Sequence, residues 1–296
     1  MTQEILQFIS IHTVADRFEA DLVMDALQKE DIHAILRTFE ETPYDGLFVS
    51  QRGWGLVLVA EENVTKAKEI ITPLIQDLQK TKLYSDPSEI DPLLWENLQE
   101  ADPETVCVNA QIRYDLEAKG YIFSLLNGKF LCIPHRRTIE VLHTLPHEKL
   151  NFEFYLVVLH YLLEAQNVPL SANWISEKEI PGGQLFFRGP HKFPTEPLLK
   201  LFGDRPEIFL AAAESLGGSP VEMGDFGYRL WAFSRVPLLF VLWKGDEEFE
   251  PALHIRFNST INSQLEALDS IWALINVICR NLKAAANNIL REQNNP

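Results

Sequence analysis

Three Asp-Pro pairs constrain the organisation of this chain more than any other feature. Asp86-Pro87, Asp91-Pro92 and Asp102-Pro103 follow one another closely, and apolar residues repeat at helix or strand spacing on both sides of them. Proline fixes its own φ, lacks an N–H and disfavours helix in the residue before it, so each pair turns the chain or starts a new element. With 296 residues, the chain is also about twice the usual domain length. We therefore predict two domains, residues 1–79 and 105–292, joined by a linker at 80–104 with room for one short helix.

The first domain has the pattern β-α-β-β-α. A strand-like stretch from Ile5 to Ile11 precedes an amphipathic helix, and His33–Thr38 forms the second strand. Leu47–Ser50 and Trp54–Val59 then predict a hairpin. A last helix follows Asn63, a residue that commonly caps helices.

The core positions of this domain resemble those of a prokaryotic signal transducing family, known as domain of unknown function 2007. The resemblance rests on four segments: the Phe8-to-His12 strand, the Glu19-to-Leu22 helix, the Gly53-to-Val59 strand and the helix around Ala67. It implies a ferredoxin-like fold and, by analogy alone, a role in sensing a ligand or a partner.

The second domain mixes hairpins with long helices. Tyr121–Leu126 and Lys129–Ile133 flank Asn127-Gly128, a pair that favours a two-residue turn. The run from Pro237 to Trp243 is continuously apolar, which is typical of a strand buried on both faces and placed at the centre of its sheet. A long helix from Leu268 carries an apolar stripe that serves either as a core face or as a dimer seam. These elements predict an α+β domain with a mixed or antiparallel sheet.

Five motifs, in order along the chain, make this second domain similar to domain of unknown function 3786. They are Leu159-His160-Tyr161-Leu162-Leu163, Trp174-Ile175-Ser176 with Glu179-Ile180-Pro181-Gly182-Gly183, Leu201-Phe202-Gly203, Arg235-Val236-Pro237-Leu238-Leu239, and Leu242-Trp243-Lys244-Gly245-Asp246-Glu247-Glu248-Phe249. The resemblance covers roughly residues 100–280 on the usual scale of domain length, and it brings no known activity. Asn258 stands where relatives commonly carry an aspartate, which weakens a catalytic role that needs an acid there.

A strand end supplies the main candidate site. Asp246 and Glu248 follow the buried strand, and alternation along the chain points them to the same side. Such oxygens suit hard cations, and paired carboxylates can divide acid and base roles, although a solvated turn is the commoner outcome. Each of the remaining candidate ligand-binding residues can also have a purely structural role: the histidine as a hydrogen-bonded core residue, the tryptophans as core aromatics and the glycines as a turn. They are His160, Trp174, Gly182, Gly183 and Trp243.

Charge and cysteine content exclude several functions. The net charge of −16 would repel a nucleic acid, and Arg136-Arg137 is too small to bind one. Three scattered cysteines, Cys107, Cys132 and Cys279, supply neither a zinc site nor the four thiolates of an iron–sulfur cluster. No apolar run reaches the roughly 20 residues that cross a bilayer. We expect a cytoplasmic protein with no nucleic-acid or membrane partner and no metal; its cofactor stays unknown, and a homo-oligomer stays open.

Two functions follow as hypotheses, because no recognised catalytic signature is present. The favoured one is a non-catalytic sensing or interaction protein, whose small domain modulates or recruits the larger one through a small molecule or a protein partner. The alternative is an enzyme with an acidic pocket, with or without a metal, built from Trp174, Asp246, Glu248 and His160. A structural adaptor that uses the C-terminal helix is a third hypothesis.

Overall fold

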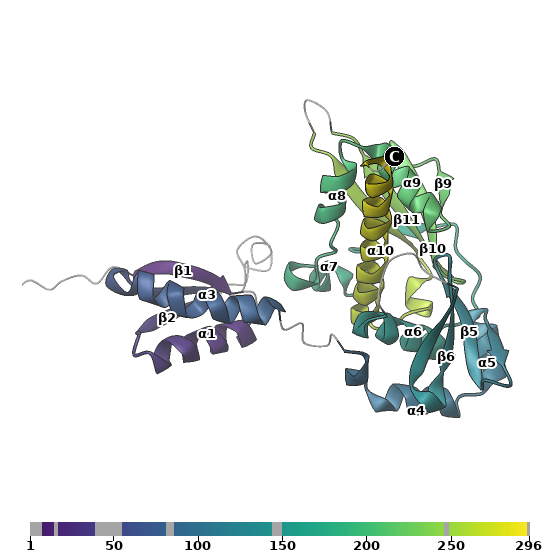
Figure 1. The fold of residues 1–296 in the computed structure, drawn as a ribbon, viewed down its shortest axis with the longest axis horizontal. Coiled ribbons are helices and arrows are strands. Elements are labelled where there is room, and N and C mark those ends of the chain that lie inside the picture. The colour runs from purple at the N-terminus through teal and green to yellow at the C-terminus, as the bar shows by residue number, and fades with distance from the viewer. Residues whose placement is uncertain are drawn as a thin grey trace, which may run out of the picture. The chain divides into compact units, whose positions relative to one another are not determined.

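The computed structural model describes residues 8–14, 17–38, 55–80, 86–143, 150–245 and 249–294. The chain forms two compact units (Figure 1). The smaller takes in Met1–Leu83, and the larger takes in Tyr84–Phe187 and His191–Pro296. Each unit has a hydrophobic core of its own. In the part of the chain that is described, no helix is both long and apolar enough to cross a bilayer.

The smaller unit is a three-stranded antiparallel sheet with two helices. Its elements are β1 (Phe8–Val14), α1 (Arg17–Lys29), β2 (Ala34–Thr38), β3 (Gly55–Ala60) and α3 (Val64–Lys80). The strand order is β1-β3-β2, so β3 lies between two strands that the chain enters before it. Val57 and Val59 of β3 pack with Val23 and Leu27 of α1 and with Ala67 of α3. The inward face of β3 and the apolar faces of both helices therefore make one small core.

The sequence pattern predicted these elements with shifted ends. The first strand ends at Val14 rather than at Ile11, and the second begins at Ala34 rather than at His33. The predicted strand residues Ile5–Gln7 and Trp54 lie outside the described residues. A β-bulge interrupts the pairing between Ser10 and His12, so simple alternation does not describe β1. The predicted strand Leu47–Ser50 lies outside the described residues.

The larger unit contains helices and two antiparallel sheets around one core. Its helices are α4 (Pro92–Glu100), α5 (Pro103–Ala110), α6 (Phe152–Glu164), α7 (Gly183–Phe186), α8 (Glu196–Phe202), α9 (Pro206–Ser215) and α10 (Leu268–Asn294). Its strands are β4 (Arg113–Asp115), β5 (Gly120–Leu125), β6 (Gly128–Ile133), β7 (Thr138–His143), β8 (Trp174–Ile175), β9 (Ser219–Val221), β10 (Phe226–Phe233), β11 (Val236–Trp243) and β12 (Ala252–Asn258). The predicted α+β class is confirmed, and every strand pairing that is described is antiparallel.

The five-stranded sheet has the order β8-β12-β11-β10-β9. β11 lies at its centre, and each of its residues from Val236 to Leu242 is buried. The apolar run thus marks the central strand, as predicted. Pro237 is tolerated there because it lies near the start of the strand, at the bulged end of the pairing with β10.

The four-stranded sheet, β4-β5-β6-β7, contains the predicted hairpin with a different turn. Leu125 pairs with Gly128, so the turn residues are Leu126 and Asn127 rather than Asn127 and Gly128. Leu126 has a φ of +53°, which is uncommon for a leucine. Its N–H donates to the carbonyl oxygen of Trp231 at 3.1 Å, and its side chain is buried. Tertiary contact with β10 therefore determines which residues form the turn, and it outweighs the local preference for Asn-Gly.

A series of aromatic rings joins the two sheets. Phe123 of β5 stacks on Phe130 of β6 at 5.4 Å between ring centroids and lies 6.2 Å from Phe233 of β10. Phe233 in turn stacks on Tyr161 of α6 at 4.1 Å, with the rings nearly parallel. The hydroxyl group of Tyr161 donates to the carbonyl oxygen of Ala110 at 2.7 Å, so the polar end of this ring is satisfied although it is buried.

The apolar stripe of α10 is a core face. Ile271, Leu274, Ile278 and Leu282 are fully buried against the rest of the larger unit. In Figure 1, α10 runs across the sheet that contains β11, with α8 and α9 beside it. Of the two roles predicted for the stripe, core face or dimer seam, the structure therefore shows the core face.

The three Asp-Pro pairs start helical elements. Asp91 accepts a hydrogen bond from the N–H of Leu93 at 2.9 Å, and Asp102 accepts one from the N–H of Thr105, also at 2.9 Å. Thr105 lowers the pKa of Asp102 through its side-chain and backbone hydrogen bonds. These are N-caps with proline in the first turn.

Helix α4 belongs to the core of the larger unit. Trp95 and Leu98 are buried in that core, and the Trp95 ring lies 6.0 Å from the ring of Tyr155 on α6. Much of the segment that the sequence predicts as a linker, residues 80–104, is therefore packed structure. The prediction differs from the structure because an Asp-Pro pair has the same sequence whether it caps a core helix or makes a turn in a linker.

We expect Trp95→Ala to lower the free energy of unfolding of the larger unit by about 3–5 kcal/mol, because it removes a large buried ring. Leu93→Ala is the matched control on the same helix, since Leu93 is 59% exposed, and it should change stability by less than about 0.5 kcal/mol. Urea unfolding of the full chain, followed by circular dichroism, measures both values. Equal effects of the two substitutions would show that α4 is not part of the core.

Candidate functional site

His160 of α6 forms a polar pair within the same helix. Its Nδ1 contacts the Oε1 of Glu164 one turn later. The other carboxylate oxygen of Glu164 accepts a hydrogen bond from the backbone N–H of Glu266 at 2.7 Å. Both side chains are mostly buried, with about a fifth of each exposed. This pair therefore links α6 to the segment that leads into α10.

Trp174 lies at one end of the five-stranded sheet, where it pairs with Asn258. Asn258 is buried, and both ends of its amide group are hydrogen-bonded: Nδ2 donates to the carbonyl oxygen of Ser171 at 2.8 Å, while Oδ1 accepts from Ser171 N–H and from Thr260. An amide provides the donor and the acceptor that this loop needs, and an ionised aspartate would provide acceptors only. Asn258 thus holds the Ser171 loop against the end of β12.

The Gly182-Gly183 pair shapes the start of α7. Gly182 has a φ of +77°, a backbone conformation that most other residues avoid. A Cβ atom on Gly183 would lie 2.1 Å from the carbonyl oxygen of Glu177, which is too close for any side chain. The local turn therefore requires both glycines, whether or not a ligand binds near them.

Trp243 lies at the other end of the same sheet from Trp174. It pairs with Ala252 at the start of β12, whereas Trp174 pairs with Asn258 at the end of that strand. Six residues of an extended strand separate the two positions by about 20 Å. The structure therefore does not bring Trp174 and Trp243 together. Asp246 and Glu248 lie outside the described residues.

Metal-ligating side chains do not gather in the described part of the chain: no group of three or more His, Cys, Asp or Glu is placed to hold an ion. The three cysteines are not joined in disulfides. Burial raises the pKa of the Cys279 thiol to about 12 and also raises that of Cys132. Both thiols are held protonated within the core.

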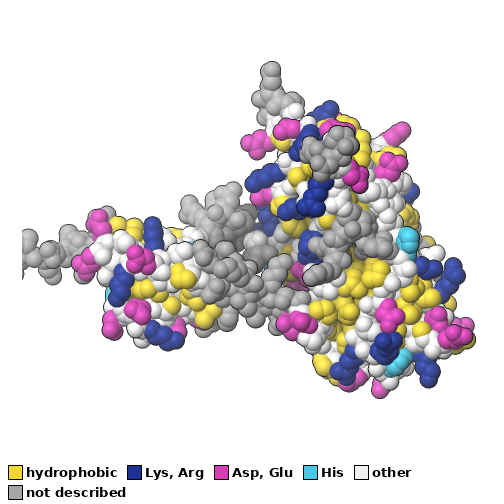
Figure 2. Space-filling view, viewed as in Figure 1, with side chains coloured by type: hydrophobic (Ala, Val, Ile, Leu, Met, Phe, Trp, Pro, Cys, Tyr) yellow, Lys and Arg dark blue, Asp and Glu magenta, His cyan; other side chains and the backbone are white. Residues whose placement is uncertain are grey.

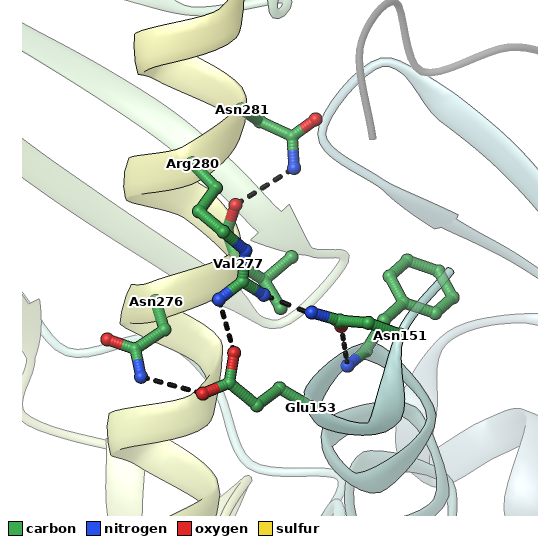
Figure 3. Close-up of polar contacts among 7 residues, drawn as sticks. Asn151, Glu153, Asn276, Val277, Arg280 and Asn281 are labelled. Atoms are coloured by element: carbon green, nitrogen blue, oxygen red, sulfur yellow. Dashed lines mark hydrogen bonds and ion pairs between the residues drawn. The ribbon is translucent and has the colours of Figure 1, made fainter. Parts of the chain in front are cut away.

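The densest polar cluster joins the start of α6 to α10 (Figure 3). Arg280 of α10 forms an ion pair with Glu153 of α6, and the other carboxylate oxygen of Glu153 accepts from Asn276 at 2.9 Å. Asn151 caps α6 by accepting from the N–H of Phe154 at 3.0 Å, and it also accepts from Arg280 at 3.5 Å. Side chains of α10 thus bond both the N-cap of α6 and a carboxylate in its first turn, so the cluster fixes how these two helices pack.

Concave surface lies on both sides of α5. One hollow of about 410 Å³ is lined by Cys107, Val108, Ile112 and Tyr114, among others, and a second of about 500 Å³ adjoins it at Pro103 and Tyr114. A third, of about 490 Å³, shares Cys107 and Val108 with the first. Figure 2 shows hydrophobic and charged side chains intermingled over the lower part of the larger unit. None of these residues was a predicted site residue.

Cys107 is the cysteine that lines the first and third of these hollows. Its side chain is half-buried, and burial, together with the nearby charge of Asp102, raises the pKa of its thiol. The sequence offers no motif around this cysteine that would have singled it out.

We expect the Glu153–Arg280 pair to show a coupling energy of about 1–3 kcal/mol in a double-mutant cycle with alanine, because both side chains are at least three-quarters buried and belong to one network. The exposed pair Glu96–Arg137 is the control, with both side chains about half exposed, and its coupling energy should stay below about 1 kcal/mol. Denaturant unfolding of the full chain measures both cycles. A coupling no larger than that of the control would mean that the cluster does not fix the two helices.

We also expect one thiol to react with iodoacetamide in the folded protein and all three after unfolding. The reactive thiol is Cys107, and because its pKa is raised, its rate should climb only at a higher pH than that of free cysteine. Peptide mass spectrometry against time and pH identifies the modified residue. Modification of Cys132 or Cys279 in the folded state would contradict their burial.

Comparison with known proteins bears on the larger unit. A family model described as a domain of unknown function, DUF3786, matches residues 102–281, which is more than half of the chain. The match begins at the Asp102 cap of α5 and ends within α10, as the resemblance over residues 100–280 predicts. No curated protein and no solved structure matches the chain. Through its larger unit, the chain belongs to the DUF3786 family.

Proposed function

We propose that this chain is a non-catalytic, cytoplasmic sensing or interaction protein, in which the smaller unit modulates or recruits the larger one. The two separate cores support two separate roles. Val57 and Val59 belong to one core and Phe233 to the other, so each unit can keep its own fold when the other unit binds a ligand or a partner. A regulatory module attached to a binding module has this organisation.

The topology of the smaller unit supports a ferredoxin-like module. A helix connects β1 to β2, and β3 is inserted between them, antiparallel to both. This is the split β-α-β arrangement of ferredoxin-like folds. We therefore keep, as part of the proposal, the resemblance of this unit to the prokaryotic signal transducing family. The fold by itself carries no activity, so the sensing role rests on that resemblance.

One observation carries the non-catalytic part of the proposal: the His160–Glu164 pair of α6 is tied to the backbone before α10. Glu164 is engaged on both carboxylate oxygens, by His160 and by the N–H of Glu266. A general base must reach a substrate proton from a cleft, and neither His160 nor Glu164 lines the hollows described along α5. The contacts of Glu164 therefore support a structural task for this pair.

The acidic strand end tests this proposal. Wild-type protein, Asp246→Asn and Glu248→Gln are heated with and without millimolar Mg²⁺, Ca²⁺ or Mn²⁺, and Glu222→Gln, which removes an exposed carboxylate elsewhere, is the control. We expect no cation to raise the thermal midpoint of the wild type by more than it raises that of the variants. A selective increase of several degrees in the wild type, lost in Asp246→Asn and kept in Glu222→Gln, would favour a metal-assisted enzyme instead.

A further inference from the structure

The third hollow beside α5 is built from three separate parts of the larger unit. Cys107, Val108 and Ile112 come from α5 and the residues after it, Ile122 comes from β5, and Ser234 comes from the turn between β10 and β11. Its volume of about 490 Å³ is in the range of small-molecule sites. Because all three parts contribute to one core, the walls of this hollow are held in place without a ligand.

Two cations line this hollow, Arg113 and Lys129, and its lining contains no Asp or Glu. Neither cation forms an ion pair or hydrogen bond with another residue in the described ranges, although Arg136 and Arg137 of the same sheet region are paired with Glu140 and Glu96. The net charge of the whole chain is −16, so the sign of the charge at this hollow is opposite to that of the protein. The two cations leave a locally positive site on an acidic protein.

The sheet directs both cations to one face. Arg113 pairs with Ile122, and Ser124, two residues further along β5, pairs with Lys129. Paired residues share a face of a sheet, and residues two apart on one strand share it too, so all four side chains lie on the same side. Strand spacing puts the Cα atoms of Arg113 and Lys129 about 12 Å apart, a span that two long side chains can close on one anionic group.

The rest of the lining combines apolar side chains with small polar ones. Val108 is 51% exposed, and Ile112 and Ile122 are half-buried beside it. Ser124, Ser234 and Gln111 add hydroxyl and amide groups that can donate hydrogen bonds. A ligand that fills this hollow can therefore contact both charged or hydrogen-bonding groups and apolar side chains.

We propose that this hollow binds a small organic anion, with a carboxylate, sulfonate or phosphate group held by Arg113 and Lys129 and an apolar body against Val108 and Ile122. A metal ion is repelled by the two cations, and two cations are too few to hold a nucleic acid against a net charge of −16. This inference names a ligand class for the binding role proposed above and so rests on it. The two fail separately, since a change in anion binding has no bearing on the response of the acidic strand end to divalent cations.

The experiment uses the full chain with a matched pair of fluorescent probes. 1-Anilinonaphthalene-8-sulfonate carries an anionic group on an aromatic body, and N-phenyl-1-naphthylamine has the same body without the sulfonate. We expect the sulfonate probe to bind saturably at one site and to slow the alkylation of Cys107 by iodoacetamide, because that thiol lines the hollow. Arg113→Gln and Lys129→Gln should each weaken its binding about two- to fivefold, the range for solvent-accessible ion pairs, and should leave the neutral probe unchanged.

Lys119→Asn is the matched control, because it removes one exposed positive charge from the same sheet region without touching this hollow. It should change neither the binding of the sulfonate probe nor the protection of Cys107. Absence of saturable binding, binding that is equal in the Arg113→Gln/Lys129→Gln double variant, or binding that leaves Cys107 unprotected would each overturn the proposal. An equal loss in Lys119→Asn would also overturn it, since the effect would then reflect net charge alone.

Discussion

The contact of Phe233 with Tyr161 and Phe123 is the constraint on which the larger unit depends. Phe233 comes from the strand next to the central one, Tyr161 from α6 and Phe123 from the second sheet. Two sheets with separate hydrogen-bond ladders share a core only if side chains bridge them. Large aromatic rings do so because each buries much area and prefers defined stacked or edge contacts. The position of α5 and of the hollows beside it follows, since the hydroxyl group of Tyr161 holds the last residue of that helix.

The polar cluster of Figure 3 has a different role from this aromatic contact. Apolar packing between α6 and α10 tolerates small rotations, because it has no directional requirement. The contacts of Glu153 with Arg280 and Asn276 are directional, and an unpaired partner would be costly where both side chains are largely buried. Aromatic and aliphatic contacts thus stabilise the packing, while the cluster selects one arrangement of the two helices.

Part of this architecture could be predicted from local sequence. The apolar run through Leu238 and Leu239 indicates the central strand, because only burial on both faces accommodates it. Leu126 could not be predicted as a turn residue, because its positive φ is stabilised by β10, far away in sequence. Asp91-Pro92 fails as a linker signal for a related reason: whether Trp95 is buried depends on α6. At the candidate site, the sequence places Trp174 and Trp243 in two of the five family motifs, yet they pair with opposite ends of β12. Arg113 and Lys129 had no local signal, since a cation that lacks a partner is recognised only once its neighbours in space are known.

The boundaries of the family match differ from the boundaries of packing. The match starts at residue 102, after α4, and ends at residue 281, whereas Trp95 and Leu98 before it and Leu282, Ala285 and Ala286 after it are buried in the same core. Sequence similarity records which positions relatives share, and it does not record which residues cover them. In this chain the matched segment, residues 102–281, therefore lacks part of the core that surrounds it. Expressed alone, it would expose the apolar surface that Trp95, Leu98 and Leu282 cover in the full chain.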